Sequence, residues 1–299
     1  MKTQNDRLRR TLESGHFAIT AELTPPRGAD FRSLQEAIAI LGNTVTAVNV
    51  TDGAGARVRM SSLAAAIYVR EHGLEPIMQM TCRDRNRLAL QAEALGAAAH
   101  GIHNVLALTG DRPADSTSLK SVFDLDSKSL VSMLAHLSKT GTTLSGSELS
   151  SSPAFFIGVA DSPVEPGPDW RPVALAAKQA AGARFVQTQY CYDPGLLSRY
   201  LERLAEFGLL DKLYFLVGLG PLPSAQAARR MREKLPGTVI PEGLIRRLEA
   251  ARDQRLEGTV ICAELIQQVR EINGVAGVHL MAPGMYREMT DAIRSAGLT

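Results

Sequence analysis

The stretch FAITAELTPPRG, residues 17–28, runs from an apolar segment through Glu22 into two consecutive prolines. Its first half predicts a buried β-strand, and Pro25-Pro26 predicts a rigid turn away from the sheet. The turn contains no G-x-G-x-x-G, the glycine pattern that follows the first strand of an open dinucleotide-binding sheet. The stretch therefore favours a closed (β/α)₈ barrel over a doubly wound open sheet.

The rest of the chain repeats this pattern of a short apolar run followed by an amphipathic segment. Predicted strands cover residues 17–22, 45–51, 75–80, 104–108, 154–159, 184–188, 212–217 and 277–281. Predicted helices cover residues 33–41, 61–71, 86–95, 127–137, 172–181, 195–207, 225–234, 241–251, 257–272 and 286–295. Eight strand–helix units are the count of a TIM barrel. We expect one single-domain (β/α)₈ barrel over residues 1–299.

Composition excludes several classes of protein. The 299 residues carry a formal net charge of +2, which suggests no nucleic-acid partner. No apolar run reaches the roughly 20 residues of a membrane helix, and the polar N-terminus lacks the core of a signal peptide. The cysteines, Cys82, Cys191 and Cys262, lie far apart without a C-x-x-C pair, so we expect no metal site and a cytoplasmic location.

In a TIM barrel the active site lies at the carboxyl ends of the strands, where loops converge. Polar residues at the predicted strand ends are therefore the candidates: Glu22, Thr51, Gln79, Thr109, Gly110, Asp111, Gln189 and His279. A carboxylate with apolar neighbours has a raised pKa, so Glu22 is a candidate proton donor. Its competing role is an ion pair with Arg27 or Arg83. From position alone, a helix cap is the commoner role for a residue such as Asp111, and a lone glutamine such as Gln189 is more often a polar residue at the edge of a site.

Six segments of the chain, most of them at the predicted strand ends, resemble in their order the sequences of the methylenetetrahydrofolate reductase family. The resemblance covers residues 17–298. It rests on sequences that occur at barrel spacing: AELTPPR at 21–27, VTDGA at 50–54, QMTCRDRNR at 79–87, LALTGD at 106–111, AGARFVQTQ at 181–189 and GVHLM at 277–281.

The resemblance implies a flavoenzyme that reduces methylenetetrahydrofolate to methyltetrahydrofolate with NADH or NADPH, through FAD. It implies that Glu22 protonates the folate nitrogen that leaves when the ring opens, and that Asp111 assists catalysis near the flavin and the substrate. Gln189 would hydrogen-bond the folate. The residues implied to contact FAD are Thr51, Gln79, Thr109, Gly110, Asp111, Ala160 and Lys178, with Lys178 at a phosphate.

The chain departs from the family at three positions near the expected flavin, the first of which is Gln79, where many members carry a histidine. Asp161 would place a carboxylate near a pyrophosphate, and Arg171 stands where other members have an acidic residue. Three alternatives stay open: a flavin-independent variant, a variant that oxidises methyltetrahydrofolate, and a folate-binding subunit that acts only in a complex. We expect a homo-oligomer, as is common in the family.

Overall fold

Eight parallel strands close into a barrel in the computed structural model, which describes residues 6–113 and 119–298. The strands are β1 (Ala18–Leu23), β2 (Ala47–Val50), β3 (Pro76–Thr81), β4 (Asn104–Leu108), β5 (Phe156–Asp161), β6 (Phe185–Tyr190), β7 (Tyr214–Leu219) and β8 (Val275–Leu280). They follow the sequence order around the barrel, and β1 pairs with β8 to close it. The predicted (β/α)₈ fold is confirmed, with strand bounds that shift by a few residues.

Helices surround the barrel. They are α1 (Arg7–Glu13), α2 (Arg32–Leu41), α3 (Ser62–Glu71), α4 (Arg87–Ala99), α5 (Ser127–Thr140), α6 (Val173–Ala181), α7 (Pro194–Glu206), α8 (Ala225–Lys234), α9 (Glu242–Ala250), α10 (Gln254–Arg270) and α11 (Tyr286–Ser295). Many begin at a side chain that caps the first turn, as the sequence chemistry favours. Such caps are Ser61, Asn86, Asp126, Asp193, Ser224 and Asp253. The connection from β7 to β8 contains α8, α9 and α10, two helices more than a regular unit, which confirms the longer final connection that the sequence predicts.

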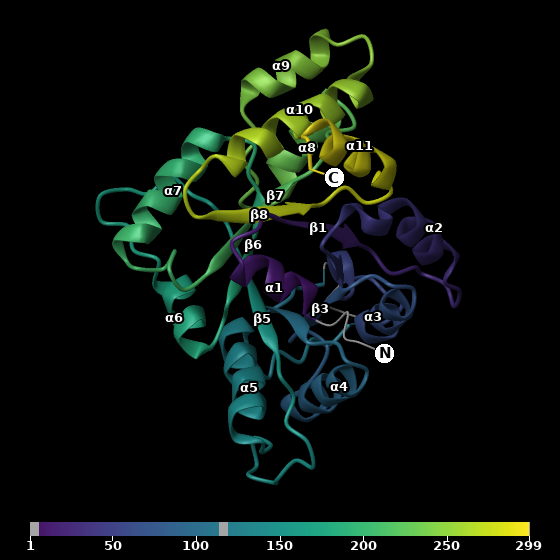
Figure 1. Ribbon diagram of the computed structural model, residues 1–299, viewed down its shortest axis with the longest axis vertical. Helices are drawn as coiled ribbons and strands as arrows, with labels where there is room; N and C mark the ends of the chain where they lie inside the picture. The colour runs from purple at the N-terminus through teal and green to yellow at the C-terminus, as the bar shows by residue number, and fades with distance from the viewer. Residues whose placement is uncertain (1–5, 114–118, 299) are drawn as a thin grey trace.

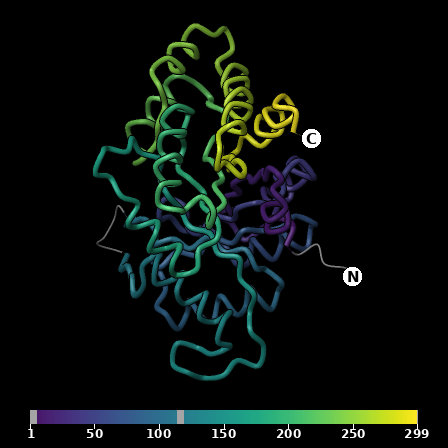
Figure 2. Tube along the Cα trace, turned by 60° about the vertical axis from the view of Figure 1, so that its left-hand side comes forward, coloured from purple at the N-terminus to yellow at the C-terminus, as the bar shows by residue number. Residues whose placement is uncertain are grey.

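The core has two parts, as a barrel requires. One part lies between the strands and the helices, where Val48, Val105 and Val217 are fully buried. The other fills the amino-terminal half of the barrel interior, with Phe156, Phe185 and Leu216 among its members. Figures 1 and 2 show α8, α9 and α10 on one side of the barrel and α4 and α5 on the opposite side.

Helix α1 closes the amino-terminal end of the barrel, and the sequence pattern had predicted no helix there. Leu8 and Leu12, one helical turn apart, pack on the interior cluster. The backbone N–H groups of Arg7 and Leu8 donate to the Glu75 carboxylate at 2.6 and 3.3 Å, which supplies an acceptor for the first turn. Figure 1 shows α1 lying across the centre of the barrel. The barrel interior is therefore open to ligands from its carboxyl end.

Candidate active site

A cavity of about 400 Å³ lies at the carboxyl ends of the barrel strands. It brings together six of the residues that the sequence predicts for the site: Glu22, Gln79, Ala160, Lys178, Gln189 and His279. They come from β1, β3, β5, α6, β6 and β8, so segments far apart in the sequence meet in one place. Leu106, Leu108 and Met281 add apolar surface to the same cavity. This is the combination of an apolar pocket with a few polar groups that small-molecule sites use.

Glu22 has the environment of a proton donor. Burial raises its pKa from 4.5 to about 7. Neither of the two arginines considered as partners from sequence forms an ion pair with it: Arg83 pairs with Asp84 at 2.6 Å, and Arg27 is exposed. The ion-pair alternative is therefore wrong, and the carboxyl group is close to half-protonated at neutral pH.

A polar cluster lies in the barrel interior near Glu22, and of its members the sequence predicts only His279, as a polar residue at a strand end. The Nδ1 atom of His279 lies 3.0 Å from the Thr20 hydroxyl and 3.4 Å from the Gln187 amide nitrogen. Its Nε2 atom lies 3.4 Å from the amide nitrogen of Asn49. Burial lowers the pKa of His279 to about 3, so the ring is neutral.

Two amide oxygens of this cluster, Asn49 Oδ1 and Gln187 Oε1, are buried without a hydrogen-bond partner among the described residues. A buried polar atom without a partner is costly, so such atoms often mark a place where a ligand or water binds. Asn49, Gln187 and His279 all line the cavity that contains Glu22. They give its floor hydrogen-bonding groups that a polar ring could use.

The alternation of side chains along a strand could have found part of this cluster. Residues two apart on a strand point to the same face. Thr20 lies two positions before Glu22, and Gln187 two positions before Gln189. The pairing of β1 with β8 then places His279 opposite Thr20. That last step needs the register of a closed barrel, which the sequence does not contain.

Two of the residues that the resemblance implies for the flavin, Ala160 and Lys178, lie on the wall formed by β5 and α6. The Lys178 ammonium donates to the carbonyl oxygen of Ala160 at 2.9 Å. The neighbouring carboxylate of Asp161 accepts a hydrogen bond from the Tyr200 hydroxyl on α7. Burial raises the pKa of Asp161, while Tyr200 and the charge of Lys178 oppose the rise. Asp161 is thus held by the protein rather than left as a free charge in the cavity.

The Gln189 side chain is held in one orientation by the backbone around it. Its Oε1 atom accepts from the Tyr190 N–H at 3.0 Å, and its Nε2 atom donates to the Pro236 carbonyl at 3.3 Å. An amide group retains one further N–H and one further lone pair after these two bonds. Gln189 is therefore positioned to donate to, or accept from, a ligand in the cavity.

The remaining candidates lie outside the lining of this cavity. Thr51 is 2% exposed with a hydroxyl that has no partner among the described residues. Thr109 and Gly110 line a separate cavity of about 390 Å³, and the Thr109 hydroxyl accepts from the Ser127 N–H at 3.0 Å. Gly110 has a φ of +91°, and a Cβ there would lie 3.0 Å from the Thr81 Cβ. Asp111 is exposed.

Two general properties of the described residues bear on function. Within residues 6–113 and 119–298, no helix combines the length and hydropathy that crossing a bilayer requires. The same residues contain no group of three His, Cys, Asp or Glu side chains arranged to hold a metal ion. The three cysteines are buried and unpaired.

Sequence comparison identifies the relatives of this chain. A family model for methylenetetrahydrofolate reductase matches residues 7–295. The chain is 24% identical over 250 residues to a probable methylenetetrahydrofolate reductase (NADPH) of Caenorhabditis elegans. The matched region covers 81% of the chain and 35% of that protein. It is 24% identical over 264 residues to methylenetetrahydrofolate reductase 2 of Schizosaccharomyces pombe, and the match covers 82% of the chain and 39% of that protein. The chain thus spans little more than a third of these relatives.

Solved structures with the same fold include two at low sequence identity. One is an uncharacterized protein from Clostridium thermocellum that binds two copies of 5-methyl-5,6,7,8-tetrahydrofolic acid, with a TM-score of 0.63, 14% identity and 97% of both chains covered. The other is an F420-dependent secondary alcohol dehydrogenase, with a TM-score of 0.57, 12% identity and coverage of 94% and 99%. These likenesses establish the barrel, and the match over residues 7–295 establishes that the chain belongs to the methylenetetrahydrofolate reductase family.

Proposed function

We propose that this protein reduces 5,10-methylenetetrahydrofolate to 5-methyltetrahydrofolate with NADH or NADPH, and that Glu22 is the general acid. The observation that carries the proposal is a half-buried carboxyl group with a pKa of about 7, without an ion-pair partner among the described residues, in a cavity at the carboxyl end of the barrel. An amine that leaves during ring opening needs a proton, and a half-protonated acid supplies it near neutral pH.

Family membership and the relatives' names support the choice of substrate. The matched relatives are named as methylenetetrahydrofolate reductases, one of them with NADPH. The barrel from Clostridium thermocellum is described as binding methyltetrahydrofolate. In this chain the floor amides Asn49 and Gln187, with their unpartnered oxygens, offer acceptors to the N–H groups of a pterin-type ring.

The residues present fit a flavin in the same cavity. Leu106, Leu108 and Ala160 give an apolar surface for a planar ring, and Gln79 offers an amide to its polar edge. Lys178 supplies a cation for a phosphate. The Asp161 carboxylate would oppose a phosphate, but its raised pKa and its bond to Tyr200 reduce that opposition. We infer that Gln79, Ala160 and Lys178 hold FAD, with Thr51, Thr109, Gly110 and Asp111 beside it.

When bound, FAD supplies a carrier that accepts hydride from NADH or NADPH and passes it to the folate carbon. The protein's own groups do the rest. Glu22 donates its proton to the folate nitrogen as the carbon–nitrogen bond breaks, and Gln189 holds the folate through its amide. Asp111 is a second carboxylate that would favour the cationic intermediate state of the folate. It is exposed and lies outside the lining of the Glu22 cavity, so this role requires that it approach the bound substrate.

One observation favours a second candidate. Asp161 lies beside Lys178 on the wall that would face a flavin phosphate, and a carboxylate there disfavours a second anion. In that case NADH or NADPH would transfer hydride directly to the folate, with Glu22 in the same role.

The visible spectrum of the purified protein separates these candidates. We expect flavin absorbance that is bleached by NADH or NADPH without oxygen and restored by methylenetetrahydrofolate. Turnover of folate without any flavin absorbance would favour direct transfer. No turnover with NADH, NADPH or a reduced dye, followed by turnover on addition of a partner protein, would instead identify a subunit of a complex.

Replacement of Lys178 tests the flavin wall. We expect Lys178→Ala to weaken FAD binding by roughly 10- to 100-fold, because a charge-assisted bond to phosphate is lost. Quenching of flavin fluorescence during titration of the apoprotein measures the change. Lys212→Ala is the matched control, since Lys212 is an exposed lysine just before β7, at the opposite end of the barrel. Equal affinities of the wild type and Lys178→Ala would remove Lys178 from the flavin site.

A further inference from the structure

A second cavity, of about 620 Å³, lies beside the Glu22 cavity and is not used by the mechanism above. It is formed by the loops that follow β2, β3 and β4 and by the start of α3. The two cavities share a wall: the backbone N–H of Asp52, which lines the second, lies 3.4 Å from the Oε1 atom of Gln79, which lines the first. A ligand held at Glu22 could therefore extend into it.

The carboxylates that line the second cavity are already bound to arginines. Asp84 pairs with Arg83 at 2.6 Å, and Arg83 also donates to the Gly53 carbonyl at 3.3 Å. Asp52 and Glu93 both pair with Arg85. The side chain of Arg83 is 6% exposed and that of Arg85 is 17% exposed, so these pairs are built into the wall. They neutralise the acidic side chains of the cavity.

Three other cations that line it, Arg57, Arg59 and Lys120, have no carboxylate partner among the described residues. Arg59 Nη1 donates to the Pro25 carbonyl at 2.9 Å, which fixes the guanidinium beside the turn that follows Glu22. Its Nε atom is buried and has no hydrogen-bond partner among the residues that the structure describes. A buried N–H of a cation without an acceptor is a costly arrangement that a bound anion would relieve.

Arg59 and Glu22 lie near the same tyrosine. Burial raises the pKa of Tyr286, at the start of α11, and the charges of Glu22 and Arg59 act on it in opposite directions. Arg59 lines the second cavity and donates to the carbonyl of Pro25, three residues after Glu22, so it lies on the side of that cavity nearer Glu22. It is well placed to bind an anion attached to a molecule whose reacting end is at Glu22.

We propose that the second cavity, lined by Arg57, Arg59 and Lys120, binds the anionic end of one of the two substrates. Two sources fit this chemistry: the phosphates of the pyridine nucleotide and the γ-linked carboxylates of a folate tail. The proposal rests on the proposed reductase function. It adds a site that raises the affinity for a substrate by binding its charged end, away from the ring that reacts at Glu22.

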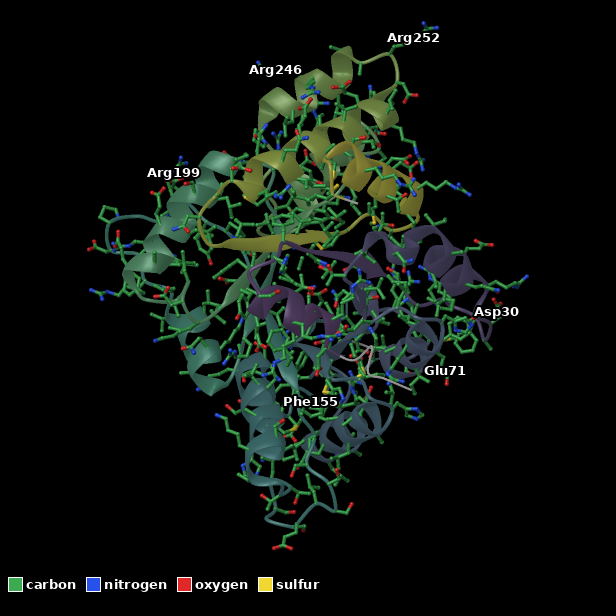
Figure 3. All side chains as sticks on the ribbon, in the orientation of Figure 1. Asp30, Glu71, Phe155, Arg199, Arg246 and Arg252 are labelled. Atoms are coloured by element: carbon green, nitrogen blue, oxygen red, sulfur yellow. The ribbon has the colours of Figure 1, made fainter. Side chains whose placement is uncertain are left out.

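Direct binding tests the cavity without any turnover. Inorganic pyrophosphate and tri-γ-glutamate are the two probes, and the melting temperature of the protein is the readout. We expect one of them to raise the melting temperature of the wild type and to have a much smaller effect on Arg59→Gln and Arg57→Gln. Arg59→Lys, which keeps the charge, should restore part of the effect. Arg252→Gln is the control, because Arg252 is exposed in the loop between α9 and α10, at the outer end of the molecule (Figure 3).

Steady-state kinetics then identify the source of the anion. We expect Arg59→Gln to raise one KM by about tenfold while kcat changes little, because uniform binding is lost. A larger rise for triglutamyl than for monoglutamyl methylenetetrahydrofolate would assign the cavity to the folate tail. A rise in the KM of NADH or NADPH would assign it to the nucleotide.

The outcomes separate this proposal from the proposed function. Protection by neither probe, or equal protection of the wild type and Arg59→Gln, would overturn the anion site even if the protein reduces folate. Loss of protection in Arg59→Gln would support the anion site even if no folate is reduced, in which case the reductase proposal alone would fail.

Discussion

Replacement of Glu22 by glutamine is expected to slow folate reduction by about 10²- to 10⁴-fold, the range that a positioned general acid contributes. Glutamine keeps the size and polarity of the side chain but has no proton to give. Oxidation of NADH or NADPH with an artificial electron acceptor should stay near the wild-type rate, since that half-reaction needs no proton from Glu22. Stopped-flow measurement of the two half-reactions separates them, with the exposed Glu36→Gln as control. Equal loss of both would show that Glu22 has a structural role.

The raised pKa of Glu22 also predicts a pH dependence. Folate reduction should fall as the pH rises above about 7, where the acid loses its proton, and Glu22→Gln should lack this dependence. Because the folded protein holds the proton more tightly than the unfolded chain, the contribution of Glu22 to stability is complete below pH 4.5 and is lost as the pH rises through 7. At pH 8, Glu22→Gln should therefore be more stable than the wild type, by about 3 kcal/mol at most. Urea unfolding at pH 5 and pH 8 measures the difference.

The second large effect is expected at Gly258, in the first half of α10. A Cβ at this position would lie 1.8 Å from the carbonyl oxygen of Leu222, in the loop that follows β7. Backbone cannot move aside as a flexible side chain can, so we expect Gly258→Ala to destabilise the protein by about 3 kcal/mol through overpacking. A glycine is needed at position 258 because α10 packs directly on the loop that follows β7.

Gly96 is the matched control for Gly258. It lies within α4, and a Cβ there would meet the Leu63 Cδ2 atom at an ordinary 3.7 Å. Alanine favours the helix over glycine, so Gly96→Ala should stabilise the protein by about 0.5–1 kcal/mol. Thermal or urea unfolding of both variants gives the comparison. An unchanged free energy of unfolding in Gly258→Ala would show that α10 can shift away from Leu222.

The fold was largely predictable because its strands are short, apolar and buried on both faces. The apolar run FFIGV at residues 155–159 is sufficient to predict a buried strand, and β5 begins within it, at Phe156. Helix α1 was missed because its signal is only Leu8 and Leu12 in a short, otherwise polar segment. Its stability comes from contact with the barrel interior rather than from its own sequence.

The site was predictable where a residue lies at a strand end. Glu22, Gln79 and Gln189 are such residues, and the structure brings them into one cavity. The contact of His279 with Thr20 depends on closure between the first and last strands, which sequence spacing does not report. The second cavity depends in the same way on loops from three strands. The ion pairs that Arg83 and Arg85 form with nearby carboxylates decide which arginines remain available.

Helix α1 has a consequence for the order in which substrates bind. Because it covers one end of the barrel, nucleotide and folate must both reach Glu22 through the loops at the other end. If they share the same surface of a flavin, the oxidised nucleotide must leave before the folate enters. Initial-rate plots at several fixed concentrations of the second substrate should then be parallel lines, whereas direct transfer would give intersecting lines. A seven-residue helix that touches no substrate would thus help to set the kinetic mechanism.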